Sequence, residues 1–155
     1  MIALDKENTL YLPIKQVYFD EIVAGTKKIE YREVKEGITA GRYLLKDART
    51  KYALNPQVVT DFSKEYFIDD IVNGAFPFLP KRYQYLSLAV GYSKERDTAL
   101  VEVTDITFHP ENVRTDHDGK PCFAFWIIEY HLGEVLEVHR KGTDTDTSLM
   151  KGILP

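Results

Sequence analysis

The fold is decided by the stretch GTKKIEYR, residues 25–32, which follows an apolar helical segment and begins an alternating one. The alternation is typical of a β-strand, whose successive side chains project from opposite faces. One face of that strand carries three charged side chains: Lys28, Glu30 and Arg32. Ile29 and Tyr31 lie on the other face, which we expect to anchor the strand in a core. The charged row is then either a ladder of ion pairs or the floor of a binding cleft.

The residues around this stretch predict a strand, a helix and a second strand, in that order. Residues 9–14 predict the first strand, with Pro13 near its end or on a sheet edge. Residues 16–24 carry apolar side chains at helical spacing, and Gly25 is suited to end that helix in a left-handed conformation. The second strand follows over residues 28–34.

The segment 35–82 is predicted to contain a helix. Ser63 is a suitable N-cap for a helix over residues 64–72, which would end at Asn73 and Gly74. The apolar face of that helix comprises four residues: Phe67, Ile68, Ile71 and Val72.

The remaining sequence predicts antiparallel strands. A hairpin is expected from residues 85–92 and 98–108, which are joined by a charged turn. The apolar run 122–131 predicts a strand buried on both faces, and Gly133 is expected to bend the chain before a last short strand. Five or six strands, with a helix between the first two, indicate an α+β domain. A small, mostly antiparallel β-barrel suits this count, because closure removes exposed sheet edges.

The composition is that of a single domain of 155 residues with a net charge of −4. The negative charge argues against tight, nonspecific binding of long nucleic acid, which needs many phosphate contacts. The single cysteine, Cys122, excludes an internal disulfide and suits a reducing compartment. No apolar run reaches the roughly 20 residues that span a bilayer, so we expect a cytoplasmic protein without membrane contact. The domain is expected over residues 1–140, with a flexible tail over 141–155.

The order of a strand, a helix ending in glycine, and then Gly-x-Lys-x-x-Glu-x-Arg resembles the signature of the ASCH domain family, which belongs to the PUA-like β-barrels. The four motif positions are filled here by Gly25, Lys27, Glu30 and Arg32. The resemblance is specific over about residues 9–34 and weaker over 84–139, and the segment 35–82 is an insertion that has no counterpart in it. It implies a pseudobarrel with a cleft beside the first helix, floored by the motif.

The resemblance also implies a function, which is binding of RNA or nucleotides in that cleft. The compact bacterial branch of the family includes amidohydrolases that deacylate N4-acylated cytosine compounds. In that branch a lysine at the position of Lys27 is catalytic, together with a threonine where this chain has Glu30. A carboxylate can accept a proton or a hydrogen bond, but it does not replace a hydroxyl nucleophile. The resemblance therefore favours recognition over catalysis, and Lys27 and Glu30 are the catalytic pair only if the chain is an enzyme.

The motif has a chemical argument of its own. A carboxylate such as Glu30 accepts hydrogen bonds from an exocyclic amine. Three cations of the stretch are suited to phosphate: Lys27, Lys28 and Arg32. The competing interpretation is that Glu30 only pairs with a neighbouring cation on a solvated strand face, which contributes little. A second cluster offers Arg82 for phosphate and Tyr83 for stacking on a base, or else it is a basic strand entry whose aromatic rings pack inward.

Three functions remain open on the sequence. The first is an ASCH-type domain that binds a short RNA or a nucleoside-like ligand through Lys27, Glu30 and Arg32, with Lys28, Arg82 and Tyr83 as further ligand-binding residues. The second is a small amidohydrolase acting on N4-acylated cytosine nucleosides. The third is a protein-interaction module that uses the insertion as its interface. No cofactor and no metal are expected in any of the three.

Overall fold

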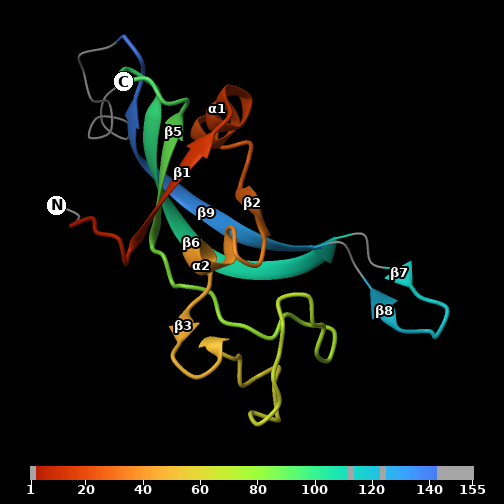
Figure 1. Ribbon diagram of the computed structural model, residues 1–155. Coiled ribbons are helices and arrows are strands. Elements are labelled where there is room, and N and C mark those ends of the chain that lie inside the picture. The colour runs from red at the N-terminus through yellow and green to blue at the C-terminus, as the bar shows by residue number, and fades with distance from the viewer. Residues whose placement is uncertain (1–2, 112–113, 123–124, 143–155) are drawn as a thin grey trace. The chain divides into compact units, whose positions relative to one another are not determined.

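Strands dominate the part of the chain that the computed structural model describes, which is residues 3–111, 114–122 and 125–142. The elements in chain order are β1 Thr9–Ile14, α1 Gln16–Ala24, β2 Ile29–Val34, α2 Ala40–Tyr43, β3 Lys46–Asp47, β4 Lys51–Tyr52, β5 Tyr85–Val90, β6 Thr98–Glu111, β7 Arg114–Thr115, β8 Pro121–Cys122 and β9 Phe125–His139 (Figure 1). The predicted α+β class is confirmed. The Cys122 side chain and residues 143–155 of the predicted tail lie outside the described part.

The main sheet has five strands in the order β1-β5-β6-β9-β2 and is mostly antiparallel. β5 and β6 form the predicted hairpin, with Tyr85 opposite Glu102. The first strand, β1, pairs in parallel with β5, from Thr9 opposite Tyr85 to Ile14 opposite Val90. Two short antiparallel pairs, β3–β4 and β7–β8, complete the strands of the described residues.

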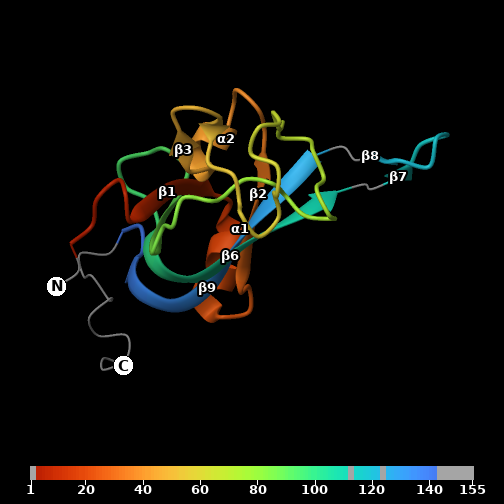
Figure 2. The same ribbon diagram turned by 90° about the horizontal axis from the view of Figure 1, so that it is seen from below.

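The chain divides into two compact units, and each of the two pockets described below is lined by residues of a single unit, the first pocket by the first unit and the second pocket by the second. The first unit comprises Met1–Glu30, Arg82–Asp105 and Tyr130–Pro155, and the second comprises Tyr31–Lys81 and Ile106–Glu129. In the first unit α1 lies beside β1 and β5 (Figure 1). In the second unit α2 and β3 are neighbours in both views (Figures 1 and 2).

The core of the first unit positions the residues that follow helix α1. Seven of its described side chains have no exposed surface: Leu12, Phe19, Leu86, Leu88, Ala89, Val101 and Tyr130. The helix ends as predicted, because Gly25 has φ of 82°, in the left-handed region. The Gly25 N–H donates to the Ile22 carbonyl at 3.0 Å, and the Thr26 N–H donates to the Glu21 carbonyl at 2.9 Å. These bonds fix the direction in which the chain enters β2.

The orientation of β2 differs from the prediction. We expected Tyr31 to face the core, but it is 47% exposed, whereas Glu30 is only 5% exposed and Val34 only 2%. The charged face of the strand therefore points inward. The alternation in the sequence separates the two faces correctly. Val34 and Glu30 lie on the same face, however, so the glutamate is buried because the valine is.

The helix predicted over residues 64–72 is wrong, and this part of the chain forms turns. The Asp61 carboxylate accepts the Ser63 N–H at 3.0 Å, and the Asp70 carboxylate accepts the Phe67 N–H at 2.7 Å. Aspartates that bind nearby backbone N–H groups offer the chain an alternative to helical hydrogen bonds. Phe67 is 57% exposed, so the intended apolar face has no burial to stabilise a short helix.

Strand β9 is longer than predicted, because Gly133 lies inside it rather than at a bend. A Cβ atom added at Gly133 would lie 2.5 Å from the Glu102 Oε1 atom and 2.7 Å from the Thr104 Cγ2 atom. The glycine is therefore required by the close approach of side chains from β6, and one continuous strand runs from Phe125 to His139.

An ion cluster in the first unit predicts acid sensitivity. Burial opposes ionisation of Asp97, but hydrogen bonds from the Lys141 N–H (2.7 Å), Gln16 (2.9 Å) and Arg140 (2.9 Å) outweigh it and hold the pKa below the ordinary value of 3.8. A lowered pKa stabilises the folded state above pH 3.8, and this contribution is lost as the pH falls through the folded-state pKa.

We therefore expect Asp97→Asn to lower the free energy of unfolding at neutral pH by about 1–3 kcal/mol, the range for a hydrogen-bonded charge. The difference from the wild type should shrink below pH 3.8. Urea unfolding at a series of pH values measures both quantities. An equal difference at every pH would contradict this assignment.

Candidate functional site

The loop between α1 and β2 places a lysine beside a buried carboxylate. The Lys27 N–H donates to the last-turn carbonyl of Glu21 at 3.1 Å, which holds the lysine backbone against the end of the helix. The Lys27 side chain is 16% exposed, and its Nζ atom lies 3.7 Å from the Glu30 Oε1 atom. The same ammonium lies 5.1 Å from the centre of the Tyr18 ring, within the range of a cation–π contact.

Glu30 is unusual in its burial. Among the described residues it is the one charged or polar residue classed as buried, with 5% of its surface exposed. Transfer of a carboxylate from water is costly unless a cation and hydrogen bonds compensate for it. Lys27 supplies such a cation in the same unit. This geometry differs from a solvated surface ladder, the simpler of the two sequence interpretations.

A pocket of about 390 Å³ adjoins this pair, and we call it the motif pocket. Its lining combines apolar side chains of α1 and β9, such as Ile22 and Leu132, with the ammonium groups of Lys27 and Lys28. Gly133 also lines the pocket. Strand β9 is joined to the loop before β2 by a hydrogen bond from the Leu132 N–H to the Lys28 carbonyl at 2.8 Å. A volume of this size is in the range of small-molecule sites.

The other predicted site residues are placed as follows. Arg32 is half-buried on β2, on the face that also carries Glu30. Arg82 is exposed, whereas Tyr83 is 8% exposed and belongs to the core. The structure therefore brings Lys27 and Glu30 together, and Lys27 and Lys28 line the motif pocket. Three other predicted site residues are not among the residues that line it: Glu30, Arg32 and Arg82.

Lys81, which precedes Arg82, has a structural role. Its Nζ atom donates to the Gly41 carbonyl at 3.0 Å. Burial, with a smaller contribution from Lys46, lowers the pKa of Lys81 below its ordinary value. In the basic cluster at residues 81–85, Arg82 is therefore exposed, whereas Lys81 is partly buried and Tyr83 is buried.

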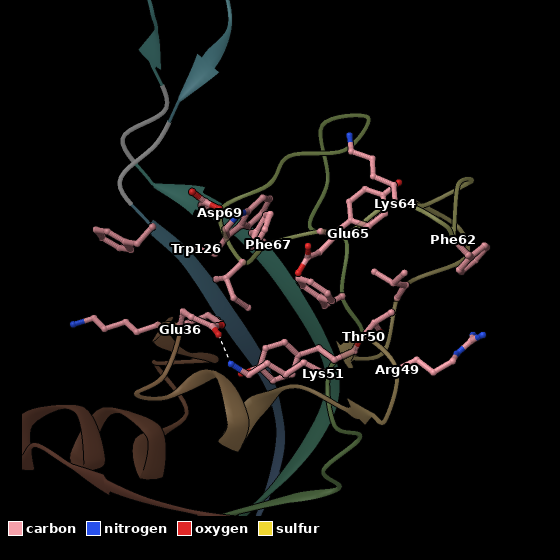
Figure 3. Close-up of a pocket in the computed structure, with 18 of the residues that line it drawn as sticks. Glu36, Arg49, Thr50, Lys51, Phe62, Lys64, Glu65, Phe67, Asp69 and Trp126 are labelled. Atoms are coloured by element: carbon pink, nitrogen blue, oxygen red, sulfur yellow. Dashed lines mark hydrogen bonds and ion pairs between the residues drawn. The ribbon is translucent and has the colours of Figure 1, made fainter.

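The second unit contains a larger pocket that the sequence analysis missed, with a volume of about 1280 Å³ (Figure 3). We call it the aromatic pocket, because seven rings line it: Tyr52, Phe62, Tyr66, Phe67, Phe78, Phe125 and Trp126. None of the motif residues Gly25, Lys27, Glu30 and Arg32 is part of its lining. The available sequence signal was the alternation of aromatic and charged residues over 62–69, which we interpreted as a helix.

Comparisons with known proteins give one family. The family model described as ASCH domain matches residues 12–138, which is most of the chain. No curated protein and no solved structure matches. Within the described residues, no helix combines the length and the apolar character needed to cross a membrane.

Proposed function

Since the chain belongs to the ASCH domain family, we propose that it binds a short RNA or a free nucleotide in the motif pocket. The proposal includes a PUA-like barrel as the fold, with residues 1–140 as the domain and residues 35–82 as an insertion in it. The family match supports a PUA-like fold of a kind that binds RNA or related ligands. The choice of ligand and of pocket rests on the chemistry of the motif.

The single observation that carries the proposal is the buried Glu30 carboxylate, 3.7 Å from the Lys27 ammonium. A charge pair kept away from water is costly, and perturbed or buried charges concentrate at functional sites. A family motif that places this pair beside a pocket therefore supports a site rather than a surface ion pair.

Each part of the pocket has a role in the proposed complex. The apolar side chains of Ile22 and Leu132 offer a surface for a flat base. Lys27 and Lys28 offer ammonium groups to phosphate oxygens. Glu30 holds Lys27 in place and accepts a hydrogen bond from an exocyclic amine. Arg82, which belongs to the same unit but is not among the lining residues, is a secondary phosphate contact in this proposal. Arg32 belongs to the second unit and is not part of the proposed site.

The test is a calorimetric titration of the full chain with each of the four ribonucleoside monophosphates and with a short single-stranded RNA. Glu30→Gln keeps the shape of the side chain and removes its charge. We expect the dissociation constant to rise about tenfold, since a hydrogen bond to a charged group contributes about 1.5–3 kcal/mol.

The matched control is Glu95→Gln, the same change at an exposed residue in the turn before β6, which should leave the dissociation constant unchanged. Equal binding by wild type and Glu30→Gln would refute the proposed role of the carboxylate. Absence of binding for all five ligands would refute the function.

A second candidate function is deacylation, in which the chain acts as an amidohydrolase and water cleaves the N4-acyl amide bond of an acylated cytidine. The observation that favours it is the amine–carboxylate pair itself, because Lys27 and Glu30 lie 3.7 Å apart beside a pocket. N4-acetylcytidine should then release acetate and cytidine, and Lys27→Ala should stop the release. A lack of turnover with a wild-type chain that binds cytidine monophosphate would leave recognition as the function.

A further inference from the structure

The aromatic pocket has the dimensions and the surfaces of a ligand site. Its volume of about 1280 Å³ exceeds that of the motif pocket, about 390 Å³. Three of the seven rings that line it, Tyr52, Phe78 and Trp126, are at most 5% exposed. They form a firm wall, because the Tyr52 and Phe78 rings pack edge to face with centres 5.6 Å apart.

Two other rings that line the pocket are exposed to solvent. Phe62 is 53% exposed and Phe67 is 57% exposed, and both lie on the segment 61–70. Large aromatic surfaces left in water carry a free-energy cost, which a ligand that covers them removes. Exposed rings that line a cavity are typical of surfaces that a ligand covers.

The segment that carries these rings is held in position by its own side chains. The Ser63 hydroxyl donates to the Asp61 carboxylate at 2.6 Å, and the Tyr66 hydroxyl donates to the Asp61 carbonyl at 3.1 Å. The Phe67 N–H donates to the Asp70 carboxylate at 2.7 Å. These bonds fix the loop in a shape that presents its rings, which reduces the entropy that a ligand must offset on binding.

The charges around the pocket show which polar groups a ligand can use. Lys35 pairs with Glu33 at 2.8 Å, and Lys51 pairs with Glu36 (Figure 3). Over the described ranges, the side chains of four other charged lining residues take part in no ion pair: Arg49, Lys64, Glu65 and Asp69. The Lys64 ammonium lies 5.4 Å from the centre of the Tyr66 ring. The carboxylate of Glu65 is turned toward the hollow of the pocket, whereas the Arg49 and Lys64 side chains reach outward at its edge (Figure 3).

This arrangement favours one class of ligand. Flat rings offer stacking surfaces to a flat heterocycle. A carboxylate turned inward accepts hydrogen bonds from an exocyclic amine, and cations at the rim suit phosphate. A cationic peptide would meet Arg49 and Lys64 at the entrance, and like charges there disfavour it. The lining contains four lysines and arginines and four carboxylates. Its net charge is therefore zero, and it offers a long polyanion little electrostatic attraction.

We infer that the aromatic pocket is a second site, which binds the base of a nucleoside monophosphate. The base stacks on Phe67 and Tyr66, Glu65 accepts a hydrogen bond from its exocyclic amine, and the phosphate lies near Arg49 and Lys64. The site is formed entirely by residues of the second unit, so it does not require the motif pocket to bind a ligand.

The chain contains its own reporter for this site. Trp126 is the single tryptophan of the sequence and lines the aromatic pocket. We expect adenosine, guanosine or cytidine monophosphate, each of which carries an exocyclic amine, to quench its fluorescence saturably in the full-length protein. Excitation at the red edge of tryptophan absorption keeps absorption by the nucleotide low.

Two variants test the inference. Phe67→Ala should raise the dissociation constant measured by quenching at least fivefold, because stacking on an aromatic ring contributes about 1–3 kcal/mol per base. Glu65→Gln should weaken binding of the amine-bearing bases more than that of uridine monophosphate. Both side chains are exposed, so the variants should fold. Tyr92→Ala removes an aromatic ring that is 87% exposed in the first unit and is the matched control, with unchanged quenching.

The outcomes separate this site from the motif pocket. Quenching that is weakened by Phe67→Ala and retained in Glu30→Gln supports the inference, whatever the fate of the motif pocket. Quenching that is lost in Glu30→Gln and unaffected by Phe67→Ala overturns it and leaves the proposed function standing. Absence of quenching by all four nucleotides, or quenching by a lysine-rich peptide alone, also overturns it.

Discussion

Alanine in place of Lys27 is expected to raise the dissociation constant for a nucleoside monophosphate by about tenfold to a hundredfold, which corresponds to about 1.4–2.8 kcal/mol. The ammonium contributes in two ways. It is the half-buried cation of the motif pocket that can meet a phosphate, and it lies 3.7 Å from the buried Glu30 carboxylate. Its removal leaves that carboxylate with weaker compensation for its burial, so the pocket loses both a contact and its organisation.

The same substitution should lower the free energy of unfolding by about 1–3 kcal/mol, the range for leaving a buried polar group without its partner. Lys94→Ala is the matched control, because Lys94 is an exposed lysine outside both pockets. It should change neither quantity. Calorimetry and urea unfolding measure the two effects. If Lys27→Ala binds like the wild type, the lysine is not a ligand contact.

Gly133→Ala is expected to destabilise the domain by about 1–3 kcal/mol, the range for overpacking of a closely packed site. The new Cβ atom would lie 2.5 Å from Glu102 Oε1 and 2.7 Å from Thr104 Cγ2. The glutamate can rotate away, but Thr104 is branched at Cβ, and its hydroxyl donates to the His131 carbonyl at 3.2 Å. The strands must therefore separate or shift. Because Gly133 lines the motif pocket, nucleotide affinity should fall as well.

Gly41→Ala is the matched control for this change. Gly41 lies in α2, and the nearest atom to an added Cβ there is 4.0 Å away. Alanine in a helix is favoured over glycine by about 1 kcal/mol, so the control should be neutral or stabilising in urea unfolding. A Gly133→Ala protein as stable as the wild type would show that the close approach of β6 to β9 is not constrained by this glycine.

Local features of the fold were predictable from the sequence. The helix over residues 16–24, its end at Gly25 and the strand that follows depend on residues next to one another, and the structure confirms them. The parallel pairing of β1 with β5 was not predictable. It places Thr9 opposite Tyr85. The residues of neither strand indicate a pairing partner so far away in the sequence.

The candidate sites were predictable to different degrees. Lys27 and Glu30 were found because a spaced motif carries them, but which face of β2 turns inward depended on packing of Val34, a tertiary effect. The aromatic pocket was missed because its walls come from segments near residues 34, 51, 65 and 126. The prediction of a helix over residues 64–72 also failed to account for Asp61 and Asp70, whose side chains bind the backbone instead.

The most direct test of the central claim, that the motif pocket binds a nucleotide, is amide chemical-shift mapping by NMR. The Phe67→Ala protein should be used, because its aromatic pocket is weakened and contributes little to the shifts. With cytidine or adenosine monophosphate we expect the largest perturbations at residues 25–30 and 132–136. Perturbations confined to other residues, or no perturbation at saturating nucleotide, would contradict the claim.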